Sequence, residues 1–316
     1  MKKKDNNSRR NFLLQAGQLL ACASAAALVS PASLLAQPVA PNDLGKKAQG
    51  KIKFSMYLYT LQDCPTPREK LDIVEICRKT RELGIDGFDF IGNGYNKSWA
   101  EIRKITDDFG LKTICYSAGV NKFLSPDLAT RKSGLDDFQE ILDIAHTLGS
   151  GRIMMPQSGS NTGNDSATNR KWMIEGLKDA LPIAKSQGIE VTIETHSHVT
   201  APFKCSSDFL EAIAIVPDLR VCFDSGNDFM HGEDPLKGYL DNKDYVTHVH
   251  FKDFASGVPG KPGPLAIPGT GVIDLRSILE AMKKQGYNGY INLERGSKDG
   301  WEVYREGMKK LGPYIA

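Results

Sequence analysis

The feature that most constrains this sequence is a regular alternation of short apolar runs with longer amphipathic stretches after residue 51. Eight runs have the length and composition of strands: Ile52–Tyr59, Ile85–Ile91, Leu111–Ser117, Arg152–Pro156, Ile189–Glu194, Leu219–Asp224, Tyr245–Phe251 and Gly289–Glu294. Helical periodicity follows most of them: Arg68–Leu83, Trp99–Phe109, Leu135–Leu148, Arg170–Ser186, Ser207–Ile215, Leu275–Gln285 and finally Trp301–Leu311. Strands that alternate with helices predict a parallel sheet.

Eight strand–helix units in about 265 residues match the size of a single barrel of the (β/α)8 or TIM type. Glycine also ends the helical stretches, where a left-handed cap needs a residue without Cβ. These glycines are Gly84, Gly110, Gly149, Gly188 and Gly286. The alternative is an open doubly wound sheet, but no glycine-rich dinucleotide motif follows the first strand. We therefore predict an α/β fold, a TIM barrel over residues 52–316.

The first 36 residues have the pattern of an export signal. A basic start that includes Arg9 and Arg10 precedes the apolar run Phe12–Leu35, and small residues surround Ala36. The segment Ser8-Arg9-Arg10-Asn11-Phe12-Leu13 resembles the twin-arginine signature. A membrane anchor is disfavoured by glutamines within the run, and a lipid anchor at Cys22 is a further alternative. We predict a linker over residues 37–51 and a periplasmic or otherwise exported protein.

Charge and cysteine content exclude several classes of protein. The formal net charge is +2, and residues 1–36 carry five basic groups and one acidic group, so the exported part would be close to −2. No basic patch indicates nucleic acid as a partner. The six cysteines lack CxxC spacing, which predicts isolated thiols rather than a disulfide framework or a zinc knuckle. No pattern indicates an oligomeric state.

Four successive strands near the C-terminus each end in a residue that can bind a metal ion: Glu194, Asp224, His250 and Glu294. Side chains alternate along a strand, so the apolar neighbours of these residues would face the helices and the four would face inward. Parallel strands of a barrel place their C-terminal ends at one rim. Polar groups inside a barrel are costly unless they are paired or bound. The four side chains are therefore predicted to converge on one divalent cation.

The donor set narrows the choice of ion. Three carboxylates and one imidazole suit Mn²⁺, Mg²⁺ or Co²⁺, with Zn²⁺ as a further candidate. A closed structural zinc site would use thiolates instead. Coordination positions would remain for two adjacent oxygens of a sugar, such as a carbonyl and a hydroxyl.

The order Glu–Asp–His–Glu on strands five to eight resembles the xylose-isomerase-like barrel superfamily. The similar segments are residues 191–196 (VTIETH), 223–227 (FDSGN), 248–253 (HVHFKD), 268–274 (PGTGVID) and 286–294 (GYNGYINLE). The resemblance implies that Glu194 and Glu294 both hold the metal and flank the substrate. One would remove a proton beside a carbonyl to give an enediolate, and the other would transfer a proton on the far face.

The chain also departs from the ketose 3-epimerases of that superfamily. They carry a histidine where this chain has Asn227 and an arginine where it has Ser256. Candidate substrate-binding residues are His196, Asn227, Lys252 and Tyr116. His196 is alternatively a residue that orients Glu194, and Lys252 alternatively pairs with Asp253 or another carboxylate.

Two further features concern the rim of the barrel. The segment Asp253–Thr270 is rich in glycine and proline and is expected to shape the pocket. His248 is expected to lie one layer deeper, in a structural role. Tyr57, Tyr59, Trp172 and Phe254 join Tyr116 as aromatic side chains that could stack on a sugar.

The leading hypothesis is an exported, metal-dependent sugar isomerase or epimerase acting through an enediolate. A 3-keto-glycoside lyase or a dehydratase on the same scaffold is the first alternative, since loss of a neighbouring group would give elimination. Its substrate would be a small sugar, a keto-sugar or a glycoside. A non-catalytic sugar- or metal-binding barrel is the second alternative. An endonuclease for abasic DNA is disfavoured because strands two and three end in Phe90-Ile91-Gly92 and Tyr116-Ser117-Ala118, without histidines.

Overall fold

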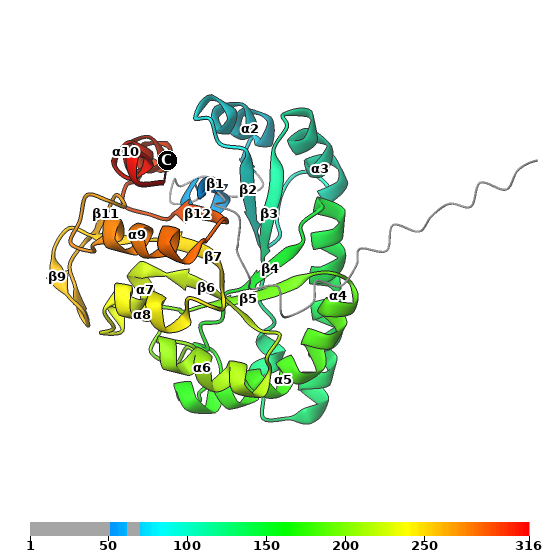
Figure 1. Ribbon diagram of the computed structural model, residues 1–316. Helices are drawn as coiled ribbons and strands as arrows, with labels where there is room; N and C mark the ends of the chain where they lie inside the picture. Colours follow the sequence, from blue (N-terminus) through cyan, green and yellow to red (C-terminus); the bar gives the residue numbers. More distant parts are fainter. Residues whose placement is uncertain (1–50, 62–69, 316) are drawn as a thin grey trace, which may run out of the picture. The chain divides into compact units, whose positions relative to one another are not determined.

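The computed structural model describes residues 51–61 and 70–315, and these form a closed barrel of eight parallel strands (Figure 1). The order around the barrel is β1-β12-β7-β6-β5-β4-β3-β2. The strands are β1 Lys53–Tyr57, β2 Gly87–Ile91, β3 Lys112–Ser117, β4 Arg152–Met155, β5 Glu190–Glu194, β6 Arg220–Asp224, β7 Val246–Phe251 and β12 Tyr290–Leu293. The predicted fold class is confirmed. The predicted signal and the linker up to residue 50 lie outside the described residues.

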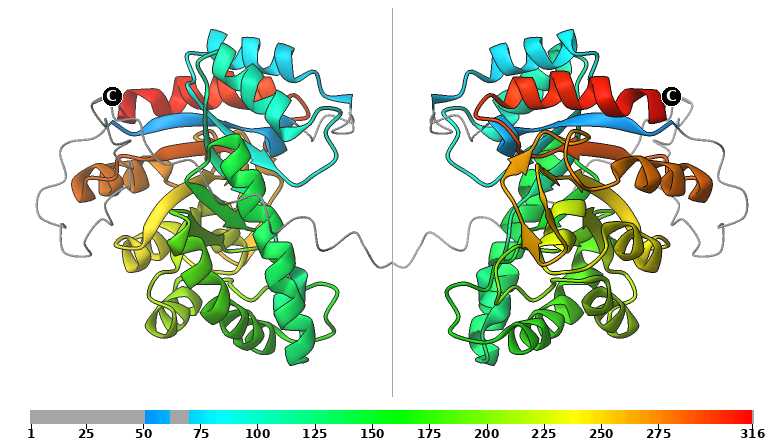
Figure 2. Two further views of the ribbon diagram at one scale, coloured as in Figure 1. Left: turned by 90° about the vertical axis from the view of Figure 1, so that its right-hand side faces the viewer. Right: turned by 90° about the vertical axis from the view of Figure 1, so that its left-hand side faces the viewer.

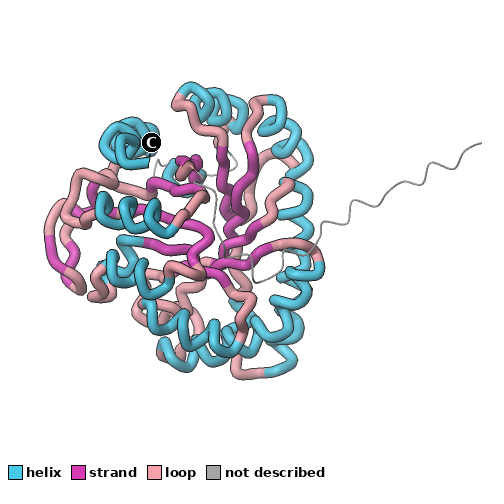
Figure 3. Tube along the Cα trace, viewed as in Figure 1, coloured by secondary structure: helices cyan, strands magenta, loops and turns pink. Residues whose placement is uncertain are grey.

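Helices surround the strands, as the tube view shows (Figure 3). They are α1 Leu58–Leu61, α2 Ile73–Glu82, α3 Trp99–Asp108, α4 Leu128–Leu148, α5 Ser166–Ser186, α6 Ser206–Ile215, α7 Ser225–Met230, α8 Pro235–Asn242, α9 Leu275–Gln285 and α10 Gly300–Ile315, with a 3-10 turn at Asn121–Leu124. Helix α10 runs beside β1 (Figure 2), where the Tyr304 hydroxyl accepts a hydrogen bond from the Tyr57 backbone N–H over 2.7 Å. No described helix has the length and apolar character needed to span a membrane.

Three elements differ from the sequence-based expectation. The first strand ends at Tyr57, which is also its last residue paired with β2. Residues Leu58–Leu61 form a single helical turn in which Leu58 and Leu61 are buried. Helices α7 and α8 were not predicted. Asp234 caps α8 with Pro235 at its first turn, a signal that the sequence does carry. Helix α7 is capped by Asp224, which the sequence analysis had assigned only to the metal.

The five glycines predicted to cap helices all have positive φ, from 65° to 78°. Gly149 and Gly286 illustrate why, since each is the left-handed C-cap of its helix, α4 and α9 respectively. Aspartates begin the same two helices, because the Asp127 and Asp274 carboxylates accept N–H groups of the first turn. These caps determine where each of the two helices begins and ends.

The alternation of side chains along the strands is also confirmed. Val221 and Phe223 of β6 belong to the large core between strands and helices, whereas Cys222 packs inside the barrel with Tyr57, Cys115 and Met154. Also inside the barrel, His248 Nε2 lies 2.8 Å from Asp89 Oδ2, and Asn292 donates to the same oxygen. His248 is thus held in the barrel interior, as expected. All four described cysteines are free thiols.

The segment after β7 is an ordered loop with four short strands: β8 Asp253–Phe254, β9 Gly257–Val258, β10 Lys261–Pro262 and β11 Leu265–Ala266. They pair antiparallel as β8 with β11 and β9 with β10. The buried Asp253 carboxylate ties the loop together by accepting backbone N–H groups of Phe254, Gly269, Gly271 and Ile273. Phe254 and Leu265 from this loop line the cavity at the barrel rim, as predicted for this segment.

Candidate active site and metal centre

The four predicted metal ligands meet at one rim of the barrel. Glu194 and Asp224 are the last residues of β5 and β6, His250 is the fifth residue of β7, and Glu294 directly follows β12. These strands are neighbours in the barrel. One potential ligand atom from each of the four residues lies within 4.8 Å of the others, and all four side chains are buried.

His250 lies between the two glutamates. Its Nδ1 atom is 3.2 Å from Glu194 Oε2 and 3.2 Å from Glu294 Oε2, and the Tyr57 ring covers it at a centroid distance of 4.7 Å. Neither ring nitrogen of His250 has a well-formed hydrogen bond with a described residue, and neither does Glu294 Oε2. Fully buried polar atoms are normally satisfied, so this grouping is one that a bound cation would complete.

Lys252 places a positive charge among the same carboxylates. Its ammonium lies 2.6 Å from Asp224 Oδ2, 3.0 Å from Glu294 Oε1 and 3.9 Å from Glu194 Oε1. Gly226 packs on the lysine stem, where a Cβ would come within 2.3 Å of the Lys252 Cβ. Lys252 therefore pairs with neighbouring carboxylates, one of the two alternatives, and not with Asp253.

Charge and burial together set the protonation states. Burial lowers the pKa of Lys252, but Asp224, Glu294 and Glu194 outweigh it and raise that pKa well above the ordinary value. Burial acts to raise the pKa of Glu294, yet Lys252 and His250 hold it below the ordinary value. The pKa of Asp224 is raised, first by burial, despite Lys252. Glu294 is thus an ionised carboxylate at neutral pH, able to accept a proton or bind a cation.

These observations fit a divalent ion. The donors are three carboxylates and an imidazole, the set expected for a hard or borderline cation such as Mg²⁺, Mn²⁺, Co²⁺ or Zn²⁺. Three buried carboxylates face two groups that favour the cationic form, Lys252 and His250. The pKa of His250 is raised, despite burial, by Cys222 and Glu194. One more positive charge would therefore balance the group. A second group, Cys222, His248 and His250, also has ligand atoms in mutual reach, but burial raises the pKa of the Cys222 thiol to about 12, which disfavours the thiolate.

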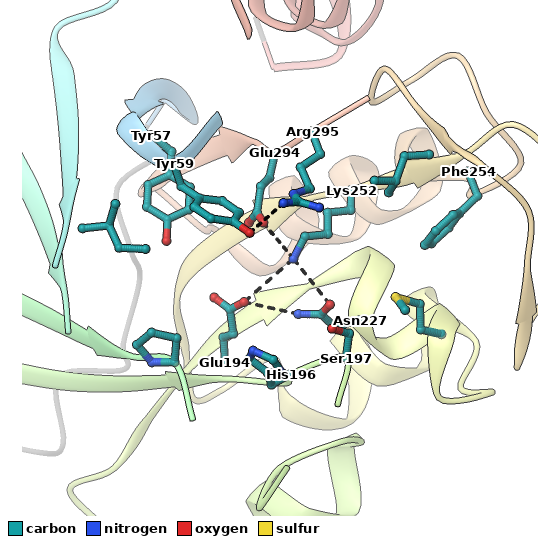
Figure 4. A pocket seen from close by; sticks show the side chains of 14 residues that line it. Tyr57, Tyr59, Glu194, His196, Ser197, Asn227, Lys252, Phe254, Glu294 and Arg295 are labelled. Atoms are coloured by element: carbon teal, nitrogen blue, oxygen red, sulfur yellow. Dashed lines mark hydrogen bonds and ion pairs between the residues drawn. The ribbon is translucent and has the colours of Figure 1, made fainter. Parts of the chain in front are cut away.

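A cavity of about 310 Å³ opens over Glu194 and Glu294 (Figure 4). Charged and polar groups, including Lys252, gather at its centre, and aromatic and aliphatic side chains stand around them. The other residues that line it are Tyr57, Tyr59, Ile91, Pro156, His196, Ser197, Asn227, Met230, Phe254, Leu265 and Arg295. This volume lies at the low end of the range for small-molecule sites.

Comparisons with known proteins identify the family to which this barrel belongs. Residues 77–314 match the model of the family described as xylose isomerase-like TIM barrel. The chain belongs to this xylose isomerase-like family. It is 24% identical to inosose dehydratase of Lacticaseibacillus casei over 263 residues, covering 75% of this chain and 86% of the relative. It is also 24% identical to fructoselysine 3-epimerase of Escherichia coli O157:H7 over 245 residues, or 72% and 86% of the two chains.

A solved structure shares the same fold. The IOLI protein with a bound zinc atom superimposes with a TM-score of 0.69 at 16% identity, covering 84% of this chain and 98% of the other. The relatives of this xylose isomerase-like protein thus include sugar epimerases and a dehydratase, and one structural neighbour contains zinc.

Asn227 takes the place of the epimerase histidine within this family member. Its Nδ2 donates to Glu194 Oε1 over 3.2 Å and to the Thr195 carbonyl over 2.5 Å, and it also lines the cavity. Asn227 therefore orients Glu194, the role that had been the alternative for His196. Ser256, at the position of the epimerase arginine, is exposed in the loop and does not line this cavity.

His196 lines the cavity and feels the charge of Glu194, but its ring hydrogen-bonds elsewhere: Nδ1 accepts the His198 backbone N–H over 3.1 Å. Burial lowers the pKa of His196, which keeps the ring neutral at pH 7. His196 is therefore placed to meet a substrate rather than to hold the base.

The prediction for Tyr116 was wrong. Tyr116 is fully buried, packs edge-on against Trp99 at 5.4 Å, and its hydroxyl donates to Asn93 Oδ1 outside the cavity. Tyr116 belongs to the core between strands and helices, because its neighbour Cys115 packs inside the barrel and side chains alternate along the strand. Trp172, on α5, is likewise absent from the cavity lining, whereas Tyr57, Tyr59 and Phe254 belong to it.

Arg295 is the charged lining residue that the sequence analysis missed. It follows Glu294 directly, and its Nη2 donates to the Tyr59 hydroxyl over 2.8 Å. The signal that could have found it is its position, since residues just beyond a strand's C-terminal end shape the active rim of a TIM barrel.

Proposed function

We propose that the protein is a divalent-metal-dependent enzyme of the sugar isomerase or epimerase type, which removes a proton from a carbon beside a carbonyl. The observation that carries this proposal is the pair of buried glutamates, Glu194 and Glu294, which share His250 between them and open onto one cavity. The names of the relatives, a sugar epimerase and an inosose dehydratase, support the same class of chemistry.

The two glutamates approach the cavity from different parts of the barrel, since β6 and β7 lie between β5 and β12. A sugar bound between them would present opposite faces of one carbon to the two carboxylates. One carboxylate removes the proton, and the other transfers a proton on the far face, which gives epimerisation. Transfer to the neighbouring carbon gives isomerisation.

Several residues would prepare these carboxylates for the reaction. Asn227 holds Glu194 by its side-chain amide, and Lys252 keeps Glu294 ionised. Asp224 and His250 would complete the ligand set with Glu194 and Glu294, and a bound divalent cation would supply Lewis-acid stabilisation of the enediolate oxygen. Lys252, which also lines the cavity, is placed to donate a hydrogen bond to a substrate oxygen.

Elimination is the second candidate on the same machinery. One relative is named inosose dehydratase, and elimination of water could begin with the same removal of a proton beside a carbonyl. If a leaving group sat on the next carbon, proton removal by Glu194 or Glu294 would expel it, as in a 3-keto-glycoside lyase. Export of the chain, which residues 1–36 predict, would favour free keto-sugars or oxidised glycosides over cytoplasmic sugar phosphates as substrates.

Deuterium exchange tests the proposal. Mn²⁺-loaded protein is incubated in D₂O with keto-sugars and 3-keto-glycosides, and deuterium beside the carbonyl is followed by NMR. We expect exchange that falls about 10²- to 10⁴-fold in Glu194→Gln and Glu294→Gln, the usual contribution of a general base. Glu280→Gln is the matched control, because Glu280 is exposed on α9 and pairs with Arg276.

Two results would contradict the proposal. Absence of exchange with every candidate would refute enolisation and favour a non-catalytic binding barrel. Exchange that survives in both glutamine variants would assign the proton transfer to other groups.

A further inference from the structure

Arg295 has an unusual backbone. Its φ of 64° makes it the single non-glycine residue with positive φ in residues 51–61 and 70–315. A long side chain adopts this conformation only where the surroundings impose it, and such residues concentrate at functional sites. The following Gly296 has φ 117°, and a Cβ there would lie 2.2 Å from the Ala266 carbonyl oxygen. The loop after β7 therefore packs onto this turn and fixes the direction in which Arg295 leaves the chain.

The guanidinium of Arg295 rests on Tyr59. Its Cζ lies 5.0 Å from the centroid of the Tyr59 ring, and Nη2 donates to the Tyr59 hydroxyl. Cation–π stacking and a hydrogen bond together hold the two side chains as one unit. Tyr59 comes from α1 at the start of the barrel and Arg295 from the end of β12, so the unit joins neighbouring rim segments. Both residues line the cavity.

This unit stands beside the proposed reaction centre rather than within it. In Figure 4, Tyr59 and Arg295 flank Glu294 on the side of the cavity opposite Glu194 and His196, and Phe254 lies beyond Lys252. Neither Tyr59 nor Arg295 belongs to the group of candidate metal ligands. The cavity thus offers a polar centre for one sugar ring and, next to it, an aromatic face with a planar fork of N–H donors.

We propose that Tyr59 and Arg295 form a second subsite, which binds the ring linked to the reacting sugar, so that the substrates are glycosides rather than free monosaccharides. This inference rests on the proposed function, which places the reacting carbon between Glu194 and Glu294. The Tyr59 ring packs against the linked ring, whether aryl or glycosyl, with the face that Arg295 does not cover. Arg295 donates hydrogen bonds to oxygens at its edge.

Binding of unreactive ligands tests the subsite. Methyl β-D-glucoside, phenyl β-D-glucoside and cellobiose share one sugar and differ in the linked group. Calorimetry with Mn²⁺-loaded protein should show the phenyl glucoside binding about fivefold more tightly than the methyl glucoside, the increment of one aromatic pair. Tyr59→Leu should abolish that difference and leave methyl glucoside affinity unchanged, while Tyr59→Phe retains it. Arg295→Met should weaken cellobiose severalfold more than methyl glucoside.

The chain supplies a matched control outside the cavity. Arg276 lies over the Tyr314 ring at 5.1 Å, a pair of the same kind on α9 and α10, so Tyr314→Leu and Arg276→Met should leave all three affinities unchanged. Thermal unfolding of each variant checks its folding. If Tyr59→Leu is poorly folded, Arg295→Met and Arg295→Lys decide the result.

The outcomes separate this inference from the proposed function. Equal affinities for the phenyl and methyl glucosides in the native protein would overturn the subsite, even if deuterium exchange proceeds. A phenyl preference that persists in Tyr59→Leu would also overturn it. A preference that disappears in Tyr59→Leu supports the subsite, even if no substrate exchanges deuterium and the enolisation mechanism fails.

Discussion

Replacement of Lys252 by Met tests whether the Lys252 ammonium provides the counter-charge that makes burial of the three carboxylates tolerable for the folded protein. The ammonium lies 2.6 Å from Asp224 and 3.0 Å from Glu294, with Glu194 at 3.9 Å, and Lys252 is 8% exposed. Removing one partner of a buried ion pair costs about 3–5 kcal/mol, because the other charge is left unpaired. Two close carboxylates lose their partner here, so we expect the free energy of unfolding to fall by about 5 kcal/mol. Methionine keeps the length of the stem, so packing changes little.

A bound divalent cation should reverse most of this loss. For a domain of this size, about 5 kcal/mol corresponds to a fall in melting temperature on the order of 10 °C. We expect that fall in protein treated with a chelator, and a much smaller one with saturating Mn²⁺, since the ion offsets the same carboxylates. Thermal unfolding followed by circular dichroism, with and without Mn²⁺, measures both.

Lys185→Met provides the control for a lysine in an exposed ion pair. Lys185 pairs with Asp218 at 2.9 Å but is 68% exposed, so its removal should leave the melting temperature unchanged. An unchanged melting temperature for chelator-treated Lys252→Met would refute the counter-charge role. An equal fall with and without Mn²⁺ would instead assign the loss to packing.

Two further predictions concern the metal and pH. The double variant Asp224→Ala plus His250→Ala should bind no Mn²⁺ at concentrations that saturate the native protein; stoichiometric metal by elemental analysis would contradict the ligand assignment. Burial, and after it the charge of Glu233, raises the pKa of Asp228. Above the pKa of about 4 that this carboxyl has in the unfolded state, the native state therefore binds more protons than the unfolded state, and the stability of the native protein falls as pH rises. Asp228→Asn should therefore gain stability relative to the native protein between pH 5 and 8 in urea unfolding, by at most about 1.4 kcal/mol per pH unit; a constant difference would refute it.

The barrel could be predicted because its signals are local. Each strand is a short apolar run, and five helices are followed by a glycine with positive φ, as Gly149 and Gly286 illustrate. The convergence of Glu194, Asp224, His250 and Glu294 then follows from strand direction and side-chain alternation, without any knowledge of contacts. Once the fold was known, only the distances remained to be found.

Features that depend on register or on distant contacts could not be predicted. Tyr116 was proposed as an aromatic residue that could stack on a sugar, but Cys115 takes the inward position on β3, so Tyr116 faces the helices. Whether Lys252 pairs with Asp253 or Asp224 depends on the conformation of the loop after β7. In the structure the Asp253 carboxylate accepts hydrogen bonds from four backbone N–H groups of that loop. Arg295 lines the cavity with a positive φ, at a turn where the next residue, Gly296, packs closely on the Ala266 carbonyl of the loop after β7.

Asp224 links the proposed chemistry to the fold. Its Oδ1 caps α7 by accepting hydrogen bonds from the backbone N–H groups of Gly226 and Asn227, while its Oδ2 accepts one from the Lys252 ammonium. The cap sets the position of Asn227, and Asn227 in turn holds Glu194. A change at Asp224 therefore disturbs the ligand set, the counter-charge and the orientation of one proposed base together. Glu294 lacks such ties to a helix end, which suits a carboxylate whose proposed task is to move a proton rather than to hold the site in place.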